Sequence, residues 1–398
     1  MSRILIITPK EPSTNPRMRK AADALAGAGH EVHVLYASNS DWGSKADKVI
    51  FKEAPWSFEL IGGDPFEARI RYFFSRLGRK ISETFGFLER AHCRSYAAYV
   101  KKGLKWNPDI VIGHNPGALG PLTRIASQLN IPSLFDAEDF HRGETASSSK
   151  ASIEVARLET KLIPLVSALT AASPLIGKAY EELFPAKQIT VVNNAFPLRT
   201  QPACPKKIDA DSLQLVWFSQ VVGLDRGLEE FLAGMALASD IQIDLTLIGL
   251  ATAELKEHIH SLVECDNHHI HFLSPMSEKD LLKKLNHFEI GLAIEPGFSP
   301  NNKIARSNKL YSYILTGCHM LVSKTKGQLQ FMDEFPSSGT IIDLKNPQTI
   351  ADAITDAFDN RDALLEKRQA NWELAKRELN WEKESRVLID LVETILKQ

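Results

Sequence analysis

The first half of the chain alternates short apolar runs with segments of helical periodicity. The runs are rich in β-branched residues and bounded by turn residues, which is typical of buried strands. Six strands are expected here, at residues 3–8, 31–37, 109–114, 131–137, 168–173 and 189–194. Asn15-Pro16 predicts a helix start, because Asn is a good N-cap and Pro suits the first helical position. Strand–helix–strand repeats with short connections predict a parallel, doubly wound sheet.

A polar, proline-rich stretch interrupts this pattern. Residues 199–212 contain Pro202 and Pro205 and lack apolar periodicity, so we expect a linker. A second series of apolar runs follows at residues 213–219, 243–249, 269–274, 289–295, 319–324 and 340–344. From about residue 351 onward the pattern is helical throughout.

Two repeats of one pattern predict two domains of the α/β class. We expect an N-terminal Rossmann-like domain at residues 1–198 and a C-terminal one at residues 213–398, each with a doubly wound parallel sheet, facing a cleft. The last helix, residues 380–398, is expected to pack back toward the N-terminal domain. Ligands of such sheets bind at the carboxyl ends of the strands, so the loops there are where chemistry is sought.

Composition narrows the class of protein. The 398 residues contain 47 Lys and Arg against 49 Asp and Glu, a net charge of −2, which argues against a dedicated nucleic-acid binder. The four cysteines form no C-x-x-C pair, which favours a reducing, cytoplasmic location. The first apolar run is too short for a signal peptide. The longest uncharged stretch, residues 162–177, is 16 residues long with two prolines, too short to span a bilayer.

Several common signatures are absent from the sequence. No G-x-G-x-x-G follows the first strand, and no G-x-x-x-x-G-K-[ST] or G-x-S-x-G occurs. The sequence therefore lacks the main motifs of dinucleotide-dependent dehydrogenases, P-loop ATPases and serine hydrolases.

One candidate site follows the first strand of the C-terminal domain. Gly223 and Gly227 bracket Asp225-Arg226 just before a helix. Glycines let a ligand approach the backbone, a helix N-terminus attracts anions, and an arginine binds a diphosphate in a bidentate manner. The alternative is an ordinary strand–helix loop with a surface arginine.

A second candidate lies after the strand that ends at Glu295. A long loop, residues 296–308, leads into a helix that we expect to be capped by Asn308 and to stop at Gly317. This region holds three cations: Lys303, Arg306 and Lys309. Such a group near a helix N-terminus suits a phosphate, although a solvated basic loop would have the same composition.

A third candidate occupies the carboxyl ends of two strands in the N-terminal domain. His114-Asn115 follows one strand, and a cluster including Asp136, Glu138 and Asp139 follows the next. Ionisable and amide groups gathered in this way suit hydrogen bonds to a polyhydroxylated ligand. A lone strand-end His is also commonly a buried structural residue.

Two other groups of closely spaced histidines could suggest a metal site, but their spacing and neighbours do not support one. His258 and His260 are two apart in a helical segment and do not share a face. His269 and His271 would share a strand face, but the sequence offers no nearby carboxylate or Cys to complete a ligand set. No metal is expected.

Taken together, these motifs resemble the GT-B-fold glycosyltransferases, in particular the retaining, family-4-like group 1 enzymes of bacterial polysaccharide biosynthesis. The matching segments are NPRMRKAADALAGAGHEVHVL, DIVIGHNPGALGPL, FDAEDFHRGE and, most specifically, SNKLYSYILTGCHMLVSKTKGQ. The resemblance implies a hexosyl- or related transferase that moves a sugar from a nucleotide diphosphate sugar, of UDP or GDP type, to a glycan or lipid-linked acceptor. It also implies retention of configuration and no metal requirement.

The resemblance assigns roles to residues. The implied catalytic residues are His114, Arg226 and Lys309. The implied donor-binding residues are Gly223, Arg226, Gly227, Gly249, Glu295, Asn302, Arg306, Asn308, Lys309 and Ser312. The implied acceptor-binding residues are Asn15, Arg17, His114, Asn115, Asp136, Glu138 and Asp139.

Two positions depart from the family pattern. Ser312 stands where many members carry a Glu that holds the ribose, and Ser219 where many carry the first Arg of the phosphate clamp. These departures leave two alternatives open: a non-catalytic sugar-nucleotide-binding protein, or a sugar-nucleotide epimerase on the same fold. Lys303 or Arg306 would supply the missing cation from the long loop.

One segment carries a strong local charge. Residues 69–105 contain ten Lys and Arg and two Glu, a local charge of +8, interleaved with Phe, Tyr and Leu. This pattern predicts contact with an anionic membrane surface, peripheral on the inner membrane face. The competing interpretation is a long core helix with a solvated basic face.

Overall fold

The computed structural model describes residues 1–263 and 265–397 and divides into two compact units. Unit 1 contains residues 1–193, 299–301 and those from Glu384 onward, and unit 2 contains residues 194–298 and 302–383. Glu264 and Gln398, which fall within the predicted ranges 213–398 and 380–398, lie outside the described residues. No helix in the described part of the chain is both long and apolar enough to cross a bilayer.

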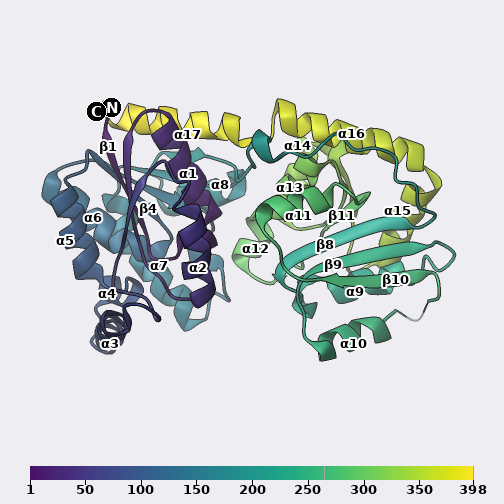
Figure 1. Cartoon of the computed structure of the whole chain (residues 1–398), viewed down its shortest axis with the longest axis horizontal. Helices are drawn as coiled ribbons and strands as arrows, with labels where there is room; N and C mark the ends of the chain where they lie inside the picture. The colour runs from purple at the N-terminus through teal and green to yellow at the C-terminus, as the bar shows by residue number, and fades with distance from the viewer. Residues whose placement is uncertain (264, 398) are drawn as a thin grey trace. The chain divides into compact units, whose positions relative to one another are not determined.

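Unit 1 is built on a seven-stranded parallel sheet in the order β3-β2-β1-β4-β5-β6-β7 (Figure 1). Its strands are β1 (Arg3–Thr8), β2 (Glu31–Tyr36), β3 (Ser57–Leu60), β4 (Ile110–His114), β5 (Ser133–Ala137), β6 (Ala168–Ala171) and β7 (Ile189–Val191). Its helices are α1 (Pro16–Gly27), α2 (Asp41–Ile50), α3 (Arg69–Thr84), α4 (Leu88–His92), α5 (Tyr96–Trp106), α6 (Leu119–Leu129), α7 (Lys150–Leu162) and α8 (Pro174–Leu183).

Unit 2 repeats the design with six parallel strands in the order β10-β9-β8-β11-β12-β13. The strands are β8 (Leu213–Val221), β9 (Ile243–Leu250), β10 (His268–Leu273), β11 (Ile290–Ala293), β12 (His319–Ser323) and β13 (Gly339–Ile342). The helices are α9 (Leu228–Met235), α10 (Ala253–Ser261), α11 (Glu278–Leu285), α12 (Pro300–Ile304), α13 (Asn308–Thr316), α14 (Lys326–Glu334), α15 (Pro347–Asp359) and α16 (Arg361–Arg377). Helix α17 (Trp381–Ile395) follows α16.

The prediction of two parallel-sheet α/β domains is confirmed, and all twelve predicted strands are present. The structure adds β3, which the sequence pattern missed because the strand has only four residues, and these are exposed or half-buried at the sheet edge. The start of α1 is also confirmed, since the Asn15 side chain accepts a hydrogen bond from the Met18 backbone N–H at 3.0 Å.

Each sheet has one point at which the strand order reverses. In unit 1 the strands on either side of it are β1 and β4, and in unit 2 they are β8 and β11. Ligands of doubly wound sheets bind outside the carboxyl ends of the strands at this switch point. The segments after these four strands are therefore the places to examine.

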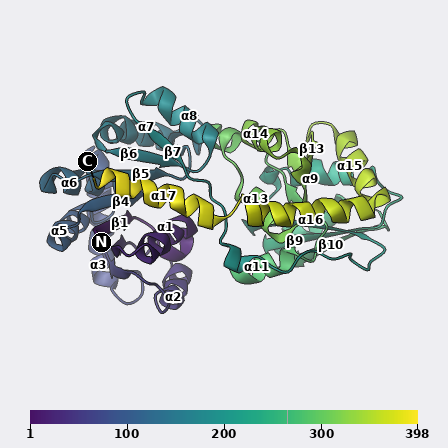
Figure 2. The same ribbon diagram turned by 90° about the horizontal axis from the view of Figure 1, so that it is seen from above.

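Helix α16 packs against α13 (Figure 2). Arg368 of α16 is fully buried, and its Nε donates to the carbonyl of Gly317 at the end of α13 at 3.2 Å. Gly317 has a φ of 69°, so it ends α13 in the left-handed conformation that the sequence predicted. The helix that starts beside the unit 2 switch point is thus fixed at its far end.

Candidate active site

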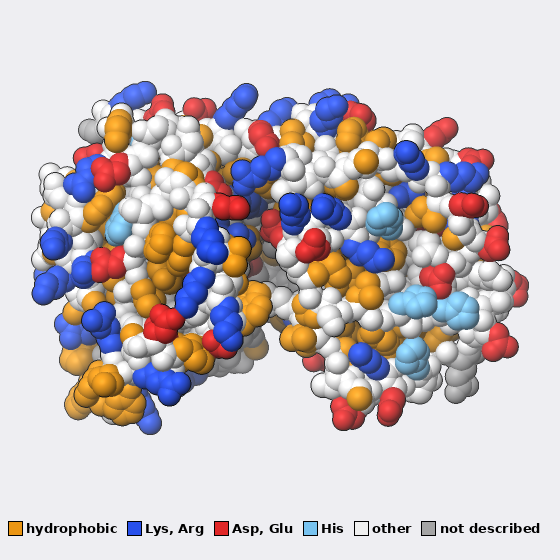
Figure 3. Space-filling view, in the orientation of Figure 1, with side chains coloured by type: hydrophobic (Ala, Val, Ile, Leu, Met, Phe, Trp, Pro, Cys, Tyr) orange, Lys and Arg blue, Asp and Glu red, His pale blue; other side chains and the backbone are white. Residues whose placement is uncertain are grey.

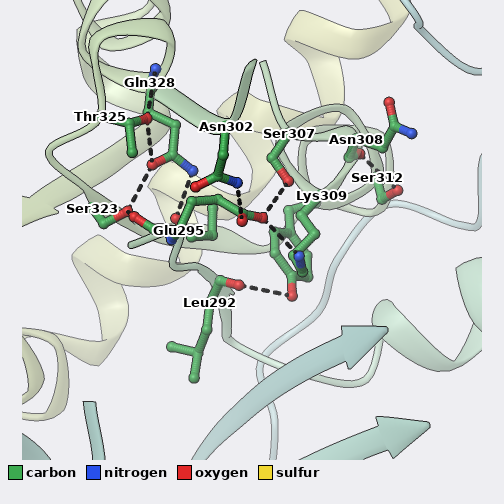
Figure 4. A network of polar contacts seen from close by, with 12 residues as sticks. Leu292, Glu295, Asn302, Ser307, Asn308, Lys309, Ser312, Ser323, Thr325 and Gln328 are labelled. Atoms are coloured by element: carbon green, nitrogen blue, oxygen red, sulfur yellow. Dashed lines mark hydrogen bonds and ion pairs between the residues drawn. The ribbon is translucent and has the colours of Figure 1, made fainter. Parts of the chain in front are cut away.

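A buried carboxylate organises the switch point of unit 2. Glu295 follows β11, and its oxygens accept hydrogen bonds from Asn302 Nδ2 at 2.9 Å and Ser307 Oγ at 3.1 Å (Figure 4). Lys309 Nζ lies 3.0 Å from Glu295 Oε1, and both side chains are only 10% exposed. Burial by itself would raise the pKa of Glu295, but Lys309 and the hydrogen bonds outweigh it and lower the pKa.

Local backbone contacts hold this network in place. The Glu295 backbone N–H donates to Ser323 Oγ at the end of β12 at 2.8 Å. Asn302 Oδ1 accepts from the Gly297 backbone N–H at 2.7 Å, which closes the turn after the strand. The loop predicted at residues 296–308 therefore contains a short helix, α12, whose Asn302 reaches back to the strand end.

Helix α13 presents Lys309 at its first turn. The Lys309 ammonium lies 5.4 Å from the centroid of the Trp217 ring on β8, a cation–π contact. The prediction that Asn308 caps this helix is wrong: Ser307 is the N-cap residue, and no side chain caps the helix. Asn308 is instead the first helical residue and accepts from Asn194 Nδ2 at 2.9 Å.

Two predicted donor residues are committed to other contacts within unit 2. The Arg306 side chain is 2% exposed, pairs with Glu334 and lies with its guanidinium 5.4 Å from the Phe331 ring centroid. Ser312 is buried, and its hydroxyl donates to the Asn308 carbonyl one turn earlier at 3.1 Å. Both side chains are engaged in these contacts within unit 2, and the donor-binding roles that the resemblance implied for them stay predictions.

The turn after β8 carries Arg226. It ends a short 3-10 helix, Leu224–Arg226, and is exposed, and no hydrogen bond or ion pair among the described residues involves its guanidinium. Gly227 has a φ of 82°, a conformation that favours glycine, and a Cβ there would also lie 2.9 Å from Leu344 Cδ1. Glycine is not required at Gly223, which is extended with open space around it.

Gly249 marks a close approach of two strands. A Cβ at this position would lie 2.7 Å from the Ser219 carbonyl oxygen. The approach coincides with the irregularity between Phe218 and Val221 in the pairing of β8 with β9. Gly249 therefore has a packing reason to be glycine, and its predicted contact with a donor stays a prediction.

A fully buried ion pair organises the switch point of unit 1. Arg17 of α1 donates from Nε and Nη2 to the two oxygens of Asp136 at 2.7 and 2.8 Å, and each residue is 4% exposed. Thr170 Oγ1 donates to the same carboxylate at 2.6 Å. Burial would raise the pKa of Asp136, but the charge of Arg17 and the contact with His114 hold it far below its usual range.

His114 ends β4 beside this pair. Its Nδ1 lies 3.0 Å from Asp136 Oδ2, close enough for an ion pair but without hydrogen-bond geometry, and the side chain is 1% exposed. Its Nε2 is buried and has no hydrogen-bond partner among the described residues. A buried imidazole nitrogen without a partner is a costly feature that a bound ligand would relieve.

Asn115 has an unusual backbone. Its φ of 65° and ψ of 153° lie in a region that residues other than glycine rarely adopt. Its side chain accepts from Asn15 Nδ2 at 3.3 Å and donates to Glu138. The strain directs this amide and Glu138 to the strand end that also carries His114, and strained backbone of this kind is frequent at functional sites.

Asp139 is the acid of the predicted acceptor set whose pKa is raised. It accepts from Asn301 Nδ2 at 2.9 Å, and burial raises its pKa to about 6. The neighbouring His141 is buried and lies 2.6 Å from Glu144. Although burial alone would lower the pKa of His141, the contacts with Glu144 and Asp139 raise it.

Three contributors escaped the sequence analysis: Thr170, Ser307 and Trp217. Thr170 had an available signal, because it sits at the end of β6 directly opposite Asp136 of β5. Ser307 and Trp217 had none, since their roles depend on how α13 sits on the sheet.

Potential metal ligands form two groups among the described residues. One consists of His114, Asp136 and Glu138, and the other of Asp139, His141 and Glu144. The Asp136 carboxylate of the first group is already neutralised by Arg17. The expectation that no carboxylate lies near His271 is wrong, because its Nε2 lies 3.0 Å from Asp244 Oδ1. No third ligand joins this pair in the parts of the chain that the structure describes.

Comparison with known proteins agrees with this architecture. Residues 14–195 match the family described as "Glycosyl transferase 4-like domain". No curated protein matches the chain in sequence.

Solved structures with the same fold are distant in sequence. HepE from Anabaena, in complex with UDP-glucose, is 12% identical with a TM-score of 0.71 over 99% of this chain and 100% of that one. Sucrose-phosphate synthase from Thermosynechococcus elongatus is 14% identical with a TM-score of 0.71, with both chains covered in full. A glycosyltransferase from Rickettsia africae is 12% identical with a TM-score of 0.69 over 100% of this chain and 99% of that one. The chain has the GT-B fold, and its residues 14–195 are similar to the glycosyl transferase 4-like domain family.

Proposed function

We propose that this glycosyltransferase transfers a sugar from a UDP- or GDP-linked donor to a hydroxyl of a glycan or lipid-linked acceptor, with retention of configuration. The observation that carries the proposal is the position of Lys309, a nearly buried cation at the first turn of α13, beside the switch point of unit 2. The solved HepE complex holds UDP-glucose, so UDP-sugars are the donors to test first.

The helix termini of unit 2 support an anionic ligand at this edge. Helices α10, α11, α14 and α15 each have a side chain that caps their first turn. Helix α9 follows β8, and α13 lies beside the end of β11. Neither of these helices has a side chain that caps its first turn, and α16 has none either. The uncapped N–H groups of α9 and α13 are available to phosphate oxygens, which helix N-termini favour.

The proposed chemistry needs charge stabilisation more than covalent help. The bond between the anomeric carbon and the leaving phosphate oxygen breaks, and a bond to the acceptor oxygen forms on the same face. The acceptor proton passes to the leaving phosphate. Arg226, Lys309 and the N-terminus of α13 stabilise the charge that develops on the diphosphate.

The unit 1 edge is proposed to bind the acceptor. His114 Nε2, Asn115 and Glu138 offer donors and acceptors suited to sugar hydroxyls. Asp136 and Arg17 position His114 and do not bind the ligand themselves, because their charges neutralise each other in a buried ion pair.

One observation favours a second candidate function. Ser312 is buried and bonded within its own helix, so no acidic side chain from that position reaches a ribose. A non-catalytic protein that binds sugar nucleotides would tolerate this difference better than an enzyme.

Ligand screening followed by a product assay tests the proposal. We expect UDP or GDP, and their sugar conjugates, to raise the thermal midpoint of the full chain, and we expect slow hydrolysis of one donor without acceptor. Binding without hydrolysis or transfer would favour the non-catalytic candidate. No shift with any UDP-, GDP- or dTDP-linked ligand would overturn the proposal. Lys309→Met should reduce the nucleotide-induced shift without abolishing it, and His114→Ala should abolish turnover while leaving that shift in place.

A further inference from the structure

Helix α3 exposes its apolar side to solvent. Ile70, Phe73 and Phe74 are 77%, 62% and 64% exposed. Leu77 and Ile81 continue the row at 42% and 48%. The spacing of three and four residues places all five on one face of the helix. Surface helices normally turn such an apolar stripe toward the core. Helix α3 has the opposite orientation, with its apolar stripe facing solvent.

The inner side of α3 is polar and firmly attached to unit 1. The buried guanidinium of Arg94 donates to Ser75 Oγ at 2.7 Å and to the Gly62 and Ser38 carbonyls at 2.9 and 2.7 Å. It also lies 4.7 Å from the centroid of the Tyr72 ring. Rotating α3 to bury its apolar face would leave Arg94 without Ser75, so the outward direction is built into the fold.

The apolar surface continues beyond the helix. Phe85 and Phe87, on either side of the turn at Gly86, are 71% and 56% exposed, and their ring centroids lie 6.5 Å apart. Figure 3 shows the resulting group of hydrophobic side chains gathered over α3 at the lower left. Contiguous apolar patches of this kind mark interaction sites. We call the face formed by Ile70, Phe73, Phe74, Leu77, Ile81, Phe85 and Phe87 the α3 face.

Positive charges surround the α3 face. Residues 69–87 contain five basic residues against the single acid Glu83. The five are Arg69, Arg71, Arg76, Arg79 and Lys80, and all are exposed. Among the described residues, Arg79 is the one member of this group that forms an ion pair, with Glu83 at 2.9 Å. An apolar centre with a basic rim complements an anionic lipid surface, whereas two such faces pressed together would bring like charges into contact.

The structure limits this surface to the first part of the predicted basic stretch. In α5, Tyr99 is fully buried, and a Cβ at Gly103 would lie 2.4 Å from Ile125 of α6, so this helix packs into the core. Lys101 and Lys105 occupy its solvent side. Residues 96–106 therefore follow the core-helix interpretation, and residues 69–87 alone present an apolar face.

We propose that the α3 face is a membrane-docking surface that lies in the interface of an anionic bilayer. The helix has 16 residues, about 24 Å at 1.5 Å per residue, which is short of the ~30 Å hydrocarbon core, and its basic residues suit the headgroup level. Phe73, Phe74 and Leu77 enter the acyl boundary, while Arg71, Arg76 and Lys80 contact lipid phosphates. This inference does not depend on the proposed sugar transfer.

Vesicle co-sedimentation of the full chain tests the docking surface. We expect binding to phosphatidylcholine vesicles that contain phosphatidylglycerol, little binding to phosphatidylcholine alone, and weaker binding at raised NaCl. Equal binding to both vesicle types, or binding to neither, would overturn the proposal.

Matched variants locate the surface. Phe73→Ser and Phe74→Ser should each weaken vesicle binding about tenfold, because each removes a buried aromatic side chain. Arg71→Gln and Lys80→Gln should each weaken it about fivefold. The control Leu237→Ser changes a side chain of unit 2 that is 56% exposed and should leave binding unchanged. Thermal midpoints should stay constant in all variants, because every altered side chain is exposed. A lipid-free dimer that Phe73→Ser dissociates in sedimentation velocity would show instead that a second copy covers this face, and would overturn the proposal.

Discussion

The ammonium of Lys309 lies 3.0 Å from Oε1 of Glu295 and 5.4 Å from the centroid of the Trp217 ring. Asn302 and Ser307 donate hydrogen bonds to the same carboxylate. These bonds hold Glu295 in position, and Glu295 in turn holds the Lys309 ammonium. The cation is thereby held at the first turn of α13 by groups that need not rearrange. A charge arranged in advance in this way stabilises a developing negative charge at little reorganisation cost.

Removing this cation is expected to slow transfer more than it weakens the fold. Lys309→Met keeps an apolar stem beside Trp217 and should lower kcat about 10²–10³-fold, the usual effect of losing one electrostatic group that acts on the transition state. Glu295→Gln leaves the ammonium in place but less firmly held, and should lower kcat about tenfold. Initial rates at saturating donor measure both effects.

Lys283 on α11 provides the control for Lys309. It is exposed in the last turn of its helix, so Lys283→Met should leave kcat within about twofold. Equal rates for the Lys309→Met and wild-type proteins would exclude Lys309 from the reaction.

Arg226 and Arg306 are expected to respond in opposite ways to the same substitution. Arg226→Met removes an exposed guanidinium beside the start of α9, so the Kd for the donor nucleotide should rise about tenfold with no change in thermal midpoint. Arg306→Met removes the partner of Glu334 and the contact with Phe331, and should lower the free energy of unfolding by about 1–3 kcal/mol. Its nucleotide Kd should stay within about twofold. Calorimetric titration and thermal unfolding separate the two, and the reverse pattern would return Arg306 to the donor site.

The sequence predicted the fold well because buried parallel strands leave a local signal. Ile4–Ile7 is an uninterrupted apolar run whose four residues are fully buried in β1. The same argument explains why β3 was missed: Ser57–Leu60 pairs only with β2 at an edge and buries little. A run of apolar residues indicates a buried strand from local sequence alone. An edge strand such as β3 forms mainly because it pairs with a strand that is remote in sequence, so it leaves a weaker local signal.

The candidate sites were predicted less completely, because side-chain direction is not local. In the sequence, Lys309 and Arg306 look alike as two cations near one helix start. In the structure, Lys309 pairs with Glu295 at the strand end, whereas Arg306 pairs with Glu334 of α14. Likewise, Thr170 can be placed beside Asp136 only through the pairing of β6 with β5, which joins residues remote in sequence. The amphipathic pattern of residues 69–87 was visible in the sequence, but its outward direction depends on Arg94.

Asp139 is expected to make the stability of the protein depend on pH. Its pKa is raised by burial from 3.8 to about 6, so the folded state favours the protonated carboxyl. The resulting stabilisation is complete below about pH 4 and is lost as the pH rises through 6, an effect of about 3 kcal/mol. Asp139→Asn keeps an acceptor for Asn301 and should remove this part of the pH dependence in urea unfolding between pH 4 and pH 7.5.

A second acid acts in the same pH range and serves as the comparison. Burial also raises the pKa of Asp47 to about 6, so Asp139→Asn should flatten the profile only in part and Asp47→Asn should remove a further share. An unchanged profile in Asp139→Asn would show that this carboxyl ionises normally in the fold.

The ion pair of Arg17 and Asp136 is expected to behave as one unit in unfolding measurements. Both side chains are buried, so Asp136→Asn leaves a guanidinium without its counter-charge and should lower the free energy of unfolding by about 3–5 kcal/mol. Arg17→Met should cost a similar amount for the complementary reason. The double variant should cost clearly less than the sum of the two, because the second substitution removes the charge that the first left unpaired. The exposed pair of Arg3 and Glu31 is the control, and Glu31→Gln should cost less than about 1 kcal/mol. Additive losses in the double variant would mean that each residue is stabilised by its other contacts, such as the hydrogen bond from Arg17 to the Val192 carbonyl at 2.7 Å.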